Sequence, residues 1–507
     1  MLKKIIPLAL VLLLACGLRF YQLGKVPMGM AWDEAAIGYN GFAIFNTRRD
    51  EWLERLPVSF RSFGDYKAPL AIYQSGLATA LFGMNLWAVR LPFAVHGVLA
   101  VLGIYLLFGE VFSRDRHRHK WALLAAFLLA ISPWHIHYSR LAFESGLALN
   151  LLLFALYFFY RYLRLAKIGN LLLAVSLASL TFYAYHSSKV TTPLLFIFLL
   201  FAYWPLLRGR LSQLIWAGFW GLLLLAPFIH DALFAQGLTR ASSTIFATNQ
   251  GLLETSVVFL NNSLSYLSLD FLIFGKNLGN FRHGDGRFGV LEPLSLVLMI
   301  CYLFWRHKDK ALFILALAMT VLGFLPAVIS EGLASSNRSL LALPGIILWV
   351  VLAFRAIWQA LNGQRALFTS LVLGAYLLIT GFYLRHYYQD YPLRSSDDFV
   401  DAYLETFHYL KQMDRSGVDQ IVFTSDYQHP YIYALFAFEL SPIAYHGGIL
   451  NLFFFADQIN QSDLEKPHTI VVASKFDDMG EHQANQVING SDGEGRFFIF
   501  LPKSAEL

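Results

Sequence analysis

Long apolar runs are the feature that most constrains what this chain can fold into. Of its 507 residues, 57% are hydrophobic and only 14% are charged, whereas about a quarter of the residues in soluble domains are charged. A helix that crosses a bilayer needs about 20 apolar residues and satisfies its own backbone hydrogen bonds. The chain contains about eleven such runs, near residues 5–23, 90–112, 121–138, 145–162, 170–187, 190–207, 212–230, 289–305, 311–329, 339–356 and 366–384. We therefore expect a polytopic α-helical membrane protein with about 11 transmembrane helices.

The Lys and Arg residues between these runs indicate the orientation. If the N-terminus is cytoplasmic, the positive-inside rule is obeyed, because every cytoplasmic loop is then basic: 113–120, 161–170, 208–210, 306–310 and 355–365. Counting the short apolar piece 69–83 as a span would reverse every later loop, so we interpret it as a helix that lies on or dips into the membrane. We expect a multi-pass protein of the plasma (inner) membrane whose first helix is not cleaved.

The remaining composition excludes several classes of protein. The net charge is +5 and no basic face accompanies a soluble fold, so nucleic acid is not an expected partner. Cys16 and Cys301 both lie inside apolar runs, so no disulfide framework is expected.

The composition becomes polar after residue 384. Residues 398–413 have the pattern of an amphipathic helix, and strands are predicted at 420–425, 469–474 and 496–501. We therefore divide the chain into a transmembrane domain, 1–384, and a small C-terminal α/β domain, 385–507. The topology predicts that this second domain is extracytoplasmic, like the loops 24–89 and 231–288.

The outer ends of the predicted spans carry the costly polar residues. Ionisable groups at membrane depth are expensive and usually mark a functional site or an ion pair. Two adjacent acids, Asp33 and Glu34, share this side with cations of the kind that bind phosphate. The other polar residues predicted there are Asp65, Tyr66, Lys67, Arg90, His137, Arg140, Glu144, His186, Lys189 and Arg338. The collection indicates a site for an anionic, amphiphilic substrate such as a lipid-linked phosphate, although interfacial anchoring explains any single Lys or Arg equally well.

Several short motifs resemble those of a known family. Trp32-Asp33-Glu34-Ala35 after a first span resembles the acidic motif of the GT-C membrane glycosyltransferases. It is most similar to the glycosyltransferase family 39 group, which includes protein O-mannosyltransferases and lipid A aminoarabinose transferases. Further segments resemble this group in the same order, namely 65–70, 90–93, 132–140 and 336–344, with Ala68 in place of the first proline of the group's Lys-Pro-Pro-Leu. The resemblance covers residues 1 to about 385.

The resemblance implies a GT-C fold and an inverting transfer of a sugar from a polyprenyl-phosphate donor to an acceptor hydroxyl. The acceptor would be a protein Ser or Thr, a lipid or a cell-envelope glycan. Asp33 would be the base, opposite the leaving phosphate, and Glu34 would orient the acceptor or help to bind a cation. The donor phosphate would be bound by Lys67, Arg90, Arg140, Lys189 and Arg338, supported by Asp65, Tyr66, His137, Glu144 and His186. No metal is required, because the leaving group is already a stable phosphate anion, and a divalent cation is optional.

Each of these assignments has a structural alternative. An acid at a helix start is stabilising in itself, so Asp33 can simply cap a helix. Arg90 either binds the catalytic acid or anchors the second span. His135 and His137 near Glu144 hint at a metal site, although polar residues that satisfy a helix end explain them better.

Two other functions are alternatives to the transferase. A transporter or flippase of lipid-linked sugars would carry ionisable residues near the bilayer midplane, broken helices and repeat symmetry. A ligase that moves a whole oligosaccharide from a pyrophosphate lipid would need a stronger acidic, metal-binding set. The C-terminal domain would alternatively be a protein-docking module.

Overall fold

The computed structural model describes residues 2–235, 242–247, 251–276, 280–306, 309–332 and 334–502. The chain forms two compact units. Unit 1 consists of Met1–Tyr21, Val58–Ala71 and Pro92–Arg385, and unit 2 consists of Gln22–Pro57, Ile72–Leu91 and His386–Leu507. The units change between residues 385 and 386, and the division predicted from the sequence, 1–384 and 385–507, stays a prediction. Unit 2 in addition contains most of the first long loop, a pairing of distant segments that the sequence does not predict.

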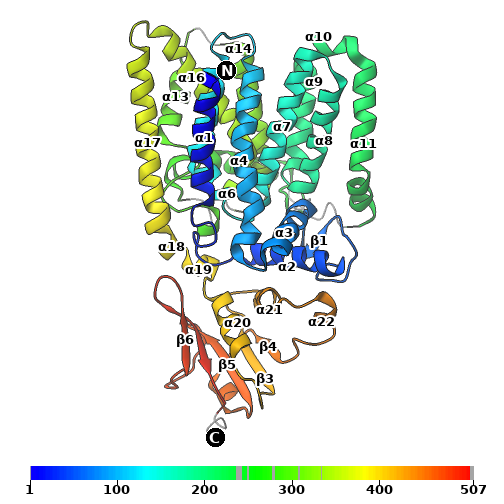
Figure 1. Cartoon of the computed structure of the whole chain (residues 1–507), viewed down its shortest axis with the longest axis vertical. Helices are drawn as coiled ribbons and strands as arrows, with labels where there is room; N and C mark the ends of the chain where they lie inside the picture. Colours follow the sequence, from blue (N-terminus) through cyan, green and yellow to red (C-terminus); the bar gives the residue numbers. More distant parts are fainter. Residues whose placement is uncertain are drawn as a thin grey trace. The chain divides into compact units, whose positions relative to one another are not determined.

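Unit 1 is a bundle of helices (Figure 1). Its helices, in chain order, are α1 (Leu2–Phe20), α4 (Leu86–Val111), α5 (Arg118–Ile131), α6 (Pro133–Tyr138), α7 (Glu144–Leu165), α8 (Ile168–Ala184), α9 (Ser188–Ala202), α10 (Trp204–Leu207), α11 (Leu211–Phe234), α12 (Leu252–Leu267), α13 (Pro293–Leu303), α14 (Lys310–Val328), α15 (Ser336–Ser339), α16 (Leu343–Ala360) and α17 (Arg365–Gln389). The first turns of α4 and the last turn of α17 belong to unit 2.

Each of the predicted apolar runs overlaps at least one of these helices. Among the described residues, six helices are long and apolar enough to cross a membrane: Leu86–Val111, Glu144–Leu165, Trp204–Phe234, Lys310–Val328, Ser336–Ala360 and Arg365–Gln389. Four shorter apolar helices accompany them. The chain is therefore a multi-pass membrane protein, and the number of about eleven spans stays a prediction.

The structure differs from the predicted spans in two places. The run 121–138 is broken, because α5 ends at Ile131 and α6 begins at Pro133. A residue before proline is disfavoured in the helical region, and Ser132 accordingly leaves it and caps α6 by accepting a hydrogen bond from the His135 amide at 3.4 Å. The second difference is α12, a helix inside the predicted loop 231–288.

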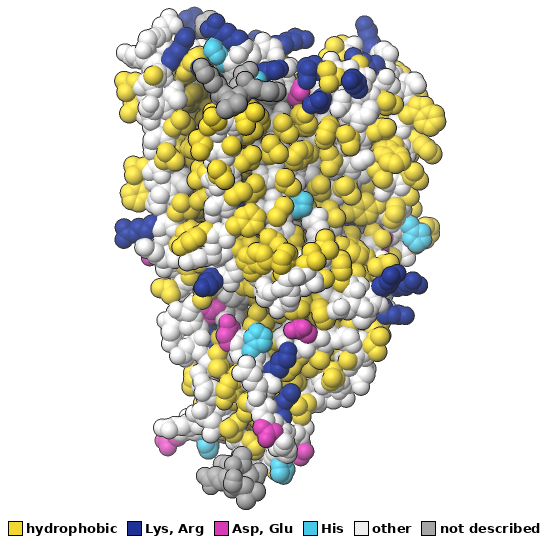
Figure 2. Space-filling model, viewed as in Figure 1, with side chains coloured by type: hydrophobic (Ala, Val, Ile, Leu, Met, Phe, Trp, Pro, Cys, Tyr) yellow, Lys and Arg dark blue, Asp and Glu magenta, His cyan; other side chains and the backbone are white. Residues whose placement is uncertain are grey.

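The basic loops predicted to be cytoplasmic contact one another within unit 1. The contacts are Arg164 to Glu110 at 2.6 Å, Arg355 to Asp115 at 3.0 Å and to Asp309 at 3.3 Å, Lys120 over the Trp358 ring, and Arg210 over the Tyr162 ring. Figure 2 shows Lys and Arg side chains gathered at the end of unit 1 that holds the N-terminus and α10, next to a broad hydrophobic surface. The five loops therefore share one end of the bundle, as a common side of the membrane requires.

Unit 2 combines helices from the first loop with an α/β tail. Its elements are α2 (Trp32–Thr47), α3 (Pro69–Phe82, which begins in unit 1), α18 (Tyr391–Arg394), α19 (Ser396–Phe399), α20 (Tyr403–Gln412), α21 (Pro430–Phe438), α22 (Pro442–His446), β3 (Gln420–Thr424), β4 (Phe453–Ala456), β5 (Thr469–Ser474), β6 (Gln486–Asn489) and β7 (Gly495–Phe500). The five strands form one sheet in the order β4-β3-β5-β7-β6, parallel at β3–β4 and β3–β5 and antiparallel at the other pairs. The three strands predicted from the sequence are β3, β5 and β7.

The two faces of the sheet have different cores, because successive strand residues point to opposite faces. On one face, Phe423 stacks on Phe407 of α20 with ring centroids 4.7 Å apart, and Tyr403 stacks on Tyr433 of α21 at 4.1 Å. On the other face, Val422 packs in an aliphatic cluster with Val471 and further buried residues. Helices α20 and α21 thus cover a single face of the sheet.

Helix α2 crosses α3 at unusually close range. A Cβ atom on Gly41 would lie 2.5 Å from the Gly76 backbone nitrogen, and a Cβ on Gly76 would lie equally close to the Gly41 carbonyl oxygen. Only glycine permits such a backbone contact. The crossing fixes α2 against α3 within unit 2.

Candidate functional site

The first turn of α2 holds the two adjacent acids. Glu34 is completely buried, and its Oε2 atom accepts a hydrogen bond from the Ala31 amide at 3.2 Å. This satisfies one of the amides that a helix start leaves without an intrahelical partner. Asp33, one residue earlier, is only half-buried. Neighbouring helical residues point in different directions, and here only one of the two carboxylates is enclosed.

Arg90 binds Glu34 from the start of α4. Its Nε and Nη2 atoms each donate to one carboxylate oxygen of Glu34 at 2.8 Å, which is a bidentate ion pair. The remaining donors reach the carbonyl oxygens of Leu23 at 3.3 Å, Pro27 at 2.9 Å and Gly29 at 2.9 Å. Arg90 is completely buried. It therefore ties the chain segment before α2 to the helix start, and the Glu34 carboxylate compensates its charge.

Helix α21 of the tail packs against α2. The Tyr433 hydroxyl donates to the Met30 carbonyl oxygen at 2.8 Å, and the rings of Trp32 and His429 meet edge to face with centroids 5.6 Å apart. A Cβ atom on Gly38 would lie 2.8 Å from the Phe436 ring. The helix that carries Asp33 is thus held by the C-terminal segment of the chain.

A second buried acidic region follows the C-terminal end of α2. Asn40 on α2 donates to Glu51 at 3.4 Å and accepts from the Glu51 amide at 2.9 Å. Asp50 is fully buried and accepts from the amides of Trp52 at 2.9 Å and Glu54 at 2.8 Å. Burial raises the pKa of Asp50 to about 6, a rise that these two amide hydrogen bonds only partly oppose.

In unit 1, Lys67 ends a short hairpin. Strands β1 (Phe60–Ser62) and β2 (Asp65–Lys67) pair antiparallel, and the two residues that connect them, Phe63 and Gly64, both have positive φ, as a tight hairpin turn requires. Lys67 is buried, at 8% exposure, whereas Asp65 and Tyr66 are half-buried.

His186 and Lys189 lie next to this hairpin. His186 donates from Nε2 to the Tyr66 carbonyl oxygen at 2.8 Å, which leaves Nδ1 to accept from Lys189 at 3.2 Å. The Lys189 ammonium also lies over the Phe228 ring at 4.7 Å, and Lys189 is half-buried. The structure thus brings four predicted residues, 66, 67, 186 and 189, to one region of unit 1.

Arg140 has different surroundings from those predicted for a phosphate ligand. It is completely buried, and it donates to the carbonyl oxygens of Leu18 at 3.0 Å and Arg19 at 3.2 Å, at the C-terminal end of α1. Arg19 in turn donates to His135 Nδ1 at 2.7 Å. These contacts attach α1 to the turn 132–140. Glu144, the first residue of α7, is half-buried.

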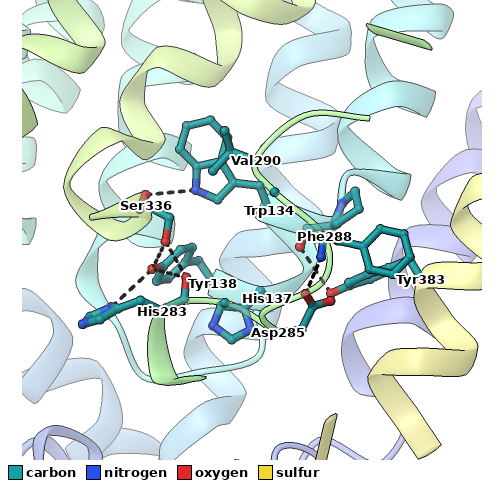
Figure 3. A pocket seen from close by; sticks show the side chains of 12 residues that line it. Trp134, His137, Tyr138, His283, Asp285, Phe288, Val290, Ser336 and Tyr383 are labelled. Atoms are coloured by element: carbon teal, nitrogen blue, oxygen red, sulfur yellow. Dashed lines mark hydrogen bonds between the residues drawn. The ribbon is translucent and has the colours of Figure 1, made fainter. Parts of the chain in front are cut away.

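His137 lines a small cavity, shown in Figure 3, and so does Ser336, which lies on the same short helix as Arg338. Arg338, on α15, is half-buried and donates to the Glu331 carbonyl oxygen at 2.9 Å. His137 donates to the Arg282 carbonyl oxygen at 2.9 Å.

Figure 3 shows hydrogen bonds between residues that line the cavity. Tyr138 and Ser336 are hydrogen-bonded at 2.6 Å, and Ser336 donates to the His283 carbonyl oxygen at 2.5 Å. The cavity, about 20 Å³, has room for a single water molecule but not for a sugar. Residues of the turn 132–140 and of the loop before α13 line this cavity.

Three groups in these regions were not predicted from the sequence: the Asp50–Glu51 pair, His283 and His429. Asp50 and Glu51 sit in a stretch of mixed charges, which gives no signal of burial. His429 precedes a proline in an otherwise ordinary turn. Among the described residues, no group of three or more His, Cys, Asp or Glu side chains is arranged to hold a metal ion.

Comparison with known proteins identifies a similar family. The profile described as "Dolichyl-phosphate-mannose-protein mannosyltransferase" matches residues 66–230. This segment includes Lys67, Arg90, Arg140 and Lys189. No curated protein matches the sequence of the chain.

Solved structures share the fold. The apo crystal structure of ArnT from Cupriavidus metallidurans has a TM-score of 0.54 and 11% identity, over 98% of this chain and 97% of ArnT. ArnT bound to undecaprenyl phosphate gives 0.51 and 12% over the same shares. The oligosaccharyltransferase of Archaeoglobus fulgidus gives 0.49 and 14%, and the match covers 86% of this chain but only 63% of that enzyme.

At such low identity the structural matches define the fold, and the profile match adds a similarity to the mannosyltransferase family over residues 66–230. The resemblance predicted from the short motifs is confirmed. The chain is a multi-pass membrane protein with the GT-C fold, similar over residues 66–230 to the mannosyltransferases of glycosyltransferase family 39.

Proposed function

We propose that this chain is an inverting glycosyltransferase that moves a sugar from a polyprenyl-phosphate donor to an acceptor hydroxyl on the extracytoplasmic side of the plasma (inner) membrane. The mannosyltransferase profile over residues 66–230 supports the class of reaction. ArnT, which has the same fold over nearly its whole length, is known in complex with undecaprenyl phosphate. The acceptor is a hydroxyl of a protein, a lipid or a cell-envelope glycan.

The observation that carries the proposal is the difference between the two adjacent acids. The Glu34 carboxylate is fully buried and its two oxygens are bound by Arg90, so it is neutralised and has no access to substrate. Asp33 is half-buried in the same first turn. The geometry thus supports Asp33 as the base and Glu34 as a positioning residue.

The proposed step uses one carboxylate and no redox partner. The acceptor oxygen attacks the anomeric carbon while the bond between that carbon and the phosphate oxygen breaks. Asp33 takes the acceptor's hydroxyl proton, and the bonding electrons leave with the polyprenyl phosphate. Attack opposite the leaving group inverts the anomeric configuration.

Cations that are partly exposed are better candidates for binding the donor phosphate than cations that are completely buried. Lys189 and Arg338 are half-buried, and Lys67, in the same unit, retains slight exposure. Arg90 and Arg140 are completely buried and bind an acid or main-chain carbonyls. We therefore assign phosphate binding to Lys67, Lys189 and Arg338, and positioning of the backbone to Arg90 and Arg140.

The test supplies purified protein with radiolabelled polyprenyl-phosphate sugars and a panel of acceptors. Asp33→Asn keeps the size of the side chain but cannot take a proton, so transfer should fall about 10²- to 10⁴-fold. Glu54→Gln, an exposed acid of the same unit, is the matched control and should retain full activity. Unchanged transfer by Asp33→Asn would remove Asp33 as the base, and a chelator arm tests the prediction that no metal is required.

A further inference from the structure

The start of α21 meets the chain segment that carries Asp33. His429 directly precedes α21, and its ring meets the Trp32 ring edge to face at a centroid distance of 5.6 Å. One turn later, the Tyr433 hydroxyl donates to the Met30 carbonyl oxygen at 2.8 Å. The start of α21 and the residue before it therefore contact the residues on both sides of Ala31, immediately before Asp33.

The two contacts differ in accessibility. Tyr433 is fully buried, as an anchor of the fold would be. His429, Trp32 and Asp33 are all half-buried. The imidazole and the indole thus meet at a partly exposed position, and Asp33 follows Trp32 directly in the chain.

The backbone at His429 and at the residue before it is strained. Gln428 and His429 have φ values of 64° and 51°, in the left-handed region that residues with a Cβ rarely adopt. His429 also precedes Pro430, which disfavours helical geometry in the preceding residue. Strain of this kind persists only where the surroundings enforce it, and it gathers at functional sites.

The N-terminal end of α2 is held by contacts from outside the helix. The first amides of a helix have no intrahelical carbonyl partner, so the first turn is held by outside contacts. Three contacts hold the main chain here: Glu34 with the Ala31 amide, Arg90 with the Gly29 carbonyl and Tyr433 with the Met30 carbonyl. His429 acts on the side chain of Trp32, the neighbour of Asp33.

We propose that His429 is a positioning residue of the transfer reaction: its ring fixes Trp32, and with it the direction of the Asp33 carboxylate. This inference rests on the proposed function, with Asp33 as the base. It makes the C-terminal segment a part of the catalytic apparatus through a single side chain.

The experiment compares four variants in full-length protein. His429→Ala removes the ring, and His429→Phe retains a ring edge against Trp32 but not the imidazole nitrogens. His408→Ala is the matched control, because His408 is exposed on α20 in the same unit. His429→Ala combined with Asp33→Asn tests whether the two residues act together.

The expected result is a fall in kcat of about tenfold or more for His429→Ala, since small displacements of a reacting group are costly. KM for the polyprenyl-phosphate donor should stay within about twofold, because no donor contact is lost. His429→Phe should recover most of kcat, and His429→Ala should cause no further loss in the Asp33→Asn background. Hydrogen exchange of residues 31–36 should be faster in His429→Ala and unchanged in His408→Ala.

Three outcomes overturn the proposal. If His429→Phe is as slow as His429→Ala, the imidazole itself takes part and His429 is not a positioning residue. If His429→Ala slows the Asp33→Asn variant by the same factor as the wild type, the two residues act independently. If the wild type transfers no sugar from any polyprenyl-phosphate donor, the proposed function fails. Hydrogen exchange then tests His429 by itself: an unchanged exchange rate at residues 31–36 in His429→Ala rejects its role.

Discussion

Helix α2 has a buried carboxylate near each end, and the two are treated differently by their surroundings. At the N-terminal end, Glu34 is fully buried and both of its oxygens are bound by Arg90 at 2.8 Å. Beyond the C-terminal end, Asp50 is equally buried, and its Oδ1 atom accepts from two backbone amides. The Asp50 Oδ2 atom has no hydrogen-bond partner among the described residues.

The two acids are equally buried but have different partners: a cation binds Glu34, whereas backbone amides bind Asp50. The N-terminal end of a helix carries a partial positive charge that favours an acid, and the C-terminal end carries a partial negative charge that disfavours one. The N-terminal end of the helix and Arg90 therefore both interact favourably with the Glu34 carboxylate. At Asp50 the loss of water outweighs the hydrogen bonds from backbone amides, and the pKa is raised to about 6.

The largest expected effect comes from breaking the Glu34 ion pair. Arg90→Ala leaves a buried carboxylate without its cation and three carbonyl oxygens without their donor. We expect the free energy of unfolding to fall by about 3–5 kcal/mol. Thermal unfolding of the detergent-solubilised protein measures this.

The double variant Glu34→Leu with Arg90→Leu is the control for that effect. Replacing both charges with apolar side chains removes the uncompensated charge, so it should cost clearly less than Arg90→Ala alone. If Arg90→Ala instead melts like the wild type and only binds the polyprenyl-phosphate donor more weakly, Arg90 is a phosphate ligand and the comparison between the two acids fails.

The second effect concerns the pH dependence that Asp50 introduces. With a folded pKa of about 6 and an ordinary value near 3.9 in the unfolded chain, the folded state binds more protons between these two values. Stability therefore falls as pH rises through this range, by at most about 3 kcal/mol. Asp50→Asn cannot ionise and should flatten the dependence of the melting temperature on pH between about 4 and 6.

Glu54→Gln again provides the matched control, because Glu54 is exposed on the same loop. It should leave most of the pH dependence in place. An Asp50→Asn variant whose melting temperature follows the wild-type profile at every pH would show that Asp50 does not cause the pH dependence.

A third, smaller effect tests a buried arginine that binds main-chain carbonyl oxygens. Arg140 donates to the carbonyl oxygens of Leu18 and Arg19 and has another cation, Arg19, next to it. Arg140→Met removes these hydrogen bonds to main-chain carbonyls, whereas Arg90→Ala also takes the cation from the Glu34 carboxylate. Arg140→Met in addition relieves the repulsion between like charges. We expect a loss of about 1–2 kcal/mol. A loss as large as that of Arg90→Ala would mean that the acid is not what makes Arg90 costly to remove.

The sequence predicts the helices better than it predicts which cations reach a substrate. The length of an apolar run can be read directly from the sequence, and each predicted span overlaps at least one helix. Arg90, Arg140 and Arg338 all follow or precede spans and look alike in the sequence. Their burial depends on partners that are distant in the chain, such as the Leu18 carbonyl for Arg140, and no local pattern reports such a partner.

The same reason explains why His429 and Asp50 were not predicted. His429 is about 400 positions from Trp32, and its role depends on how the tail folds against the first loop. The acidic motif at Asp33 was found because two adjacent acids after an apolar run are conspicuous by themselves. The division of labour between them depends on Arg90, which was predicted as a ligand of either the acid or the phosphate.

The smallest expected effect tests how the tail holds the N-terminal end of α2. Tyr433→Phe removes the hydrogen bond to the Met30 carbonyl oxygen without changing the shape of the side chain, so the free energy of unfolding should fall by about 1 kcal/mol. Tyr409→Phe is the control, since Tyr409 is half-buried on α20 of the same unit. If the two variants melt alike, the hydrogen bond contributes nothing. The contact between α21 and α2 then depends on packing alone, above all on Phe436 against Gly38, where a Cβ atom would lie 2.8 Å from the ring.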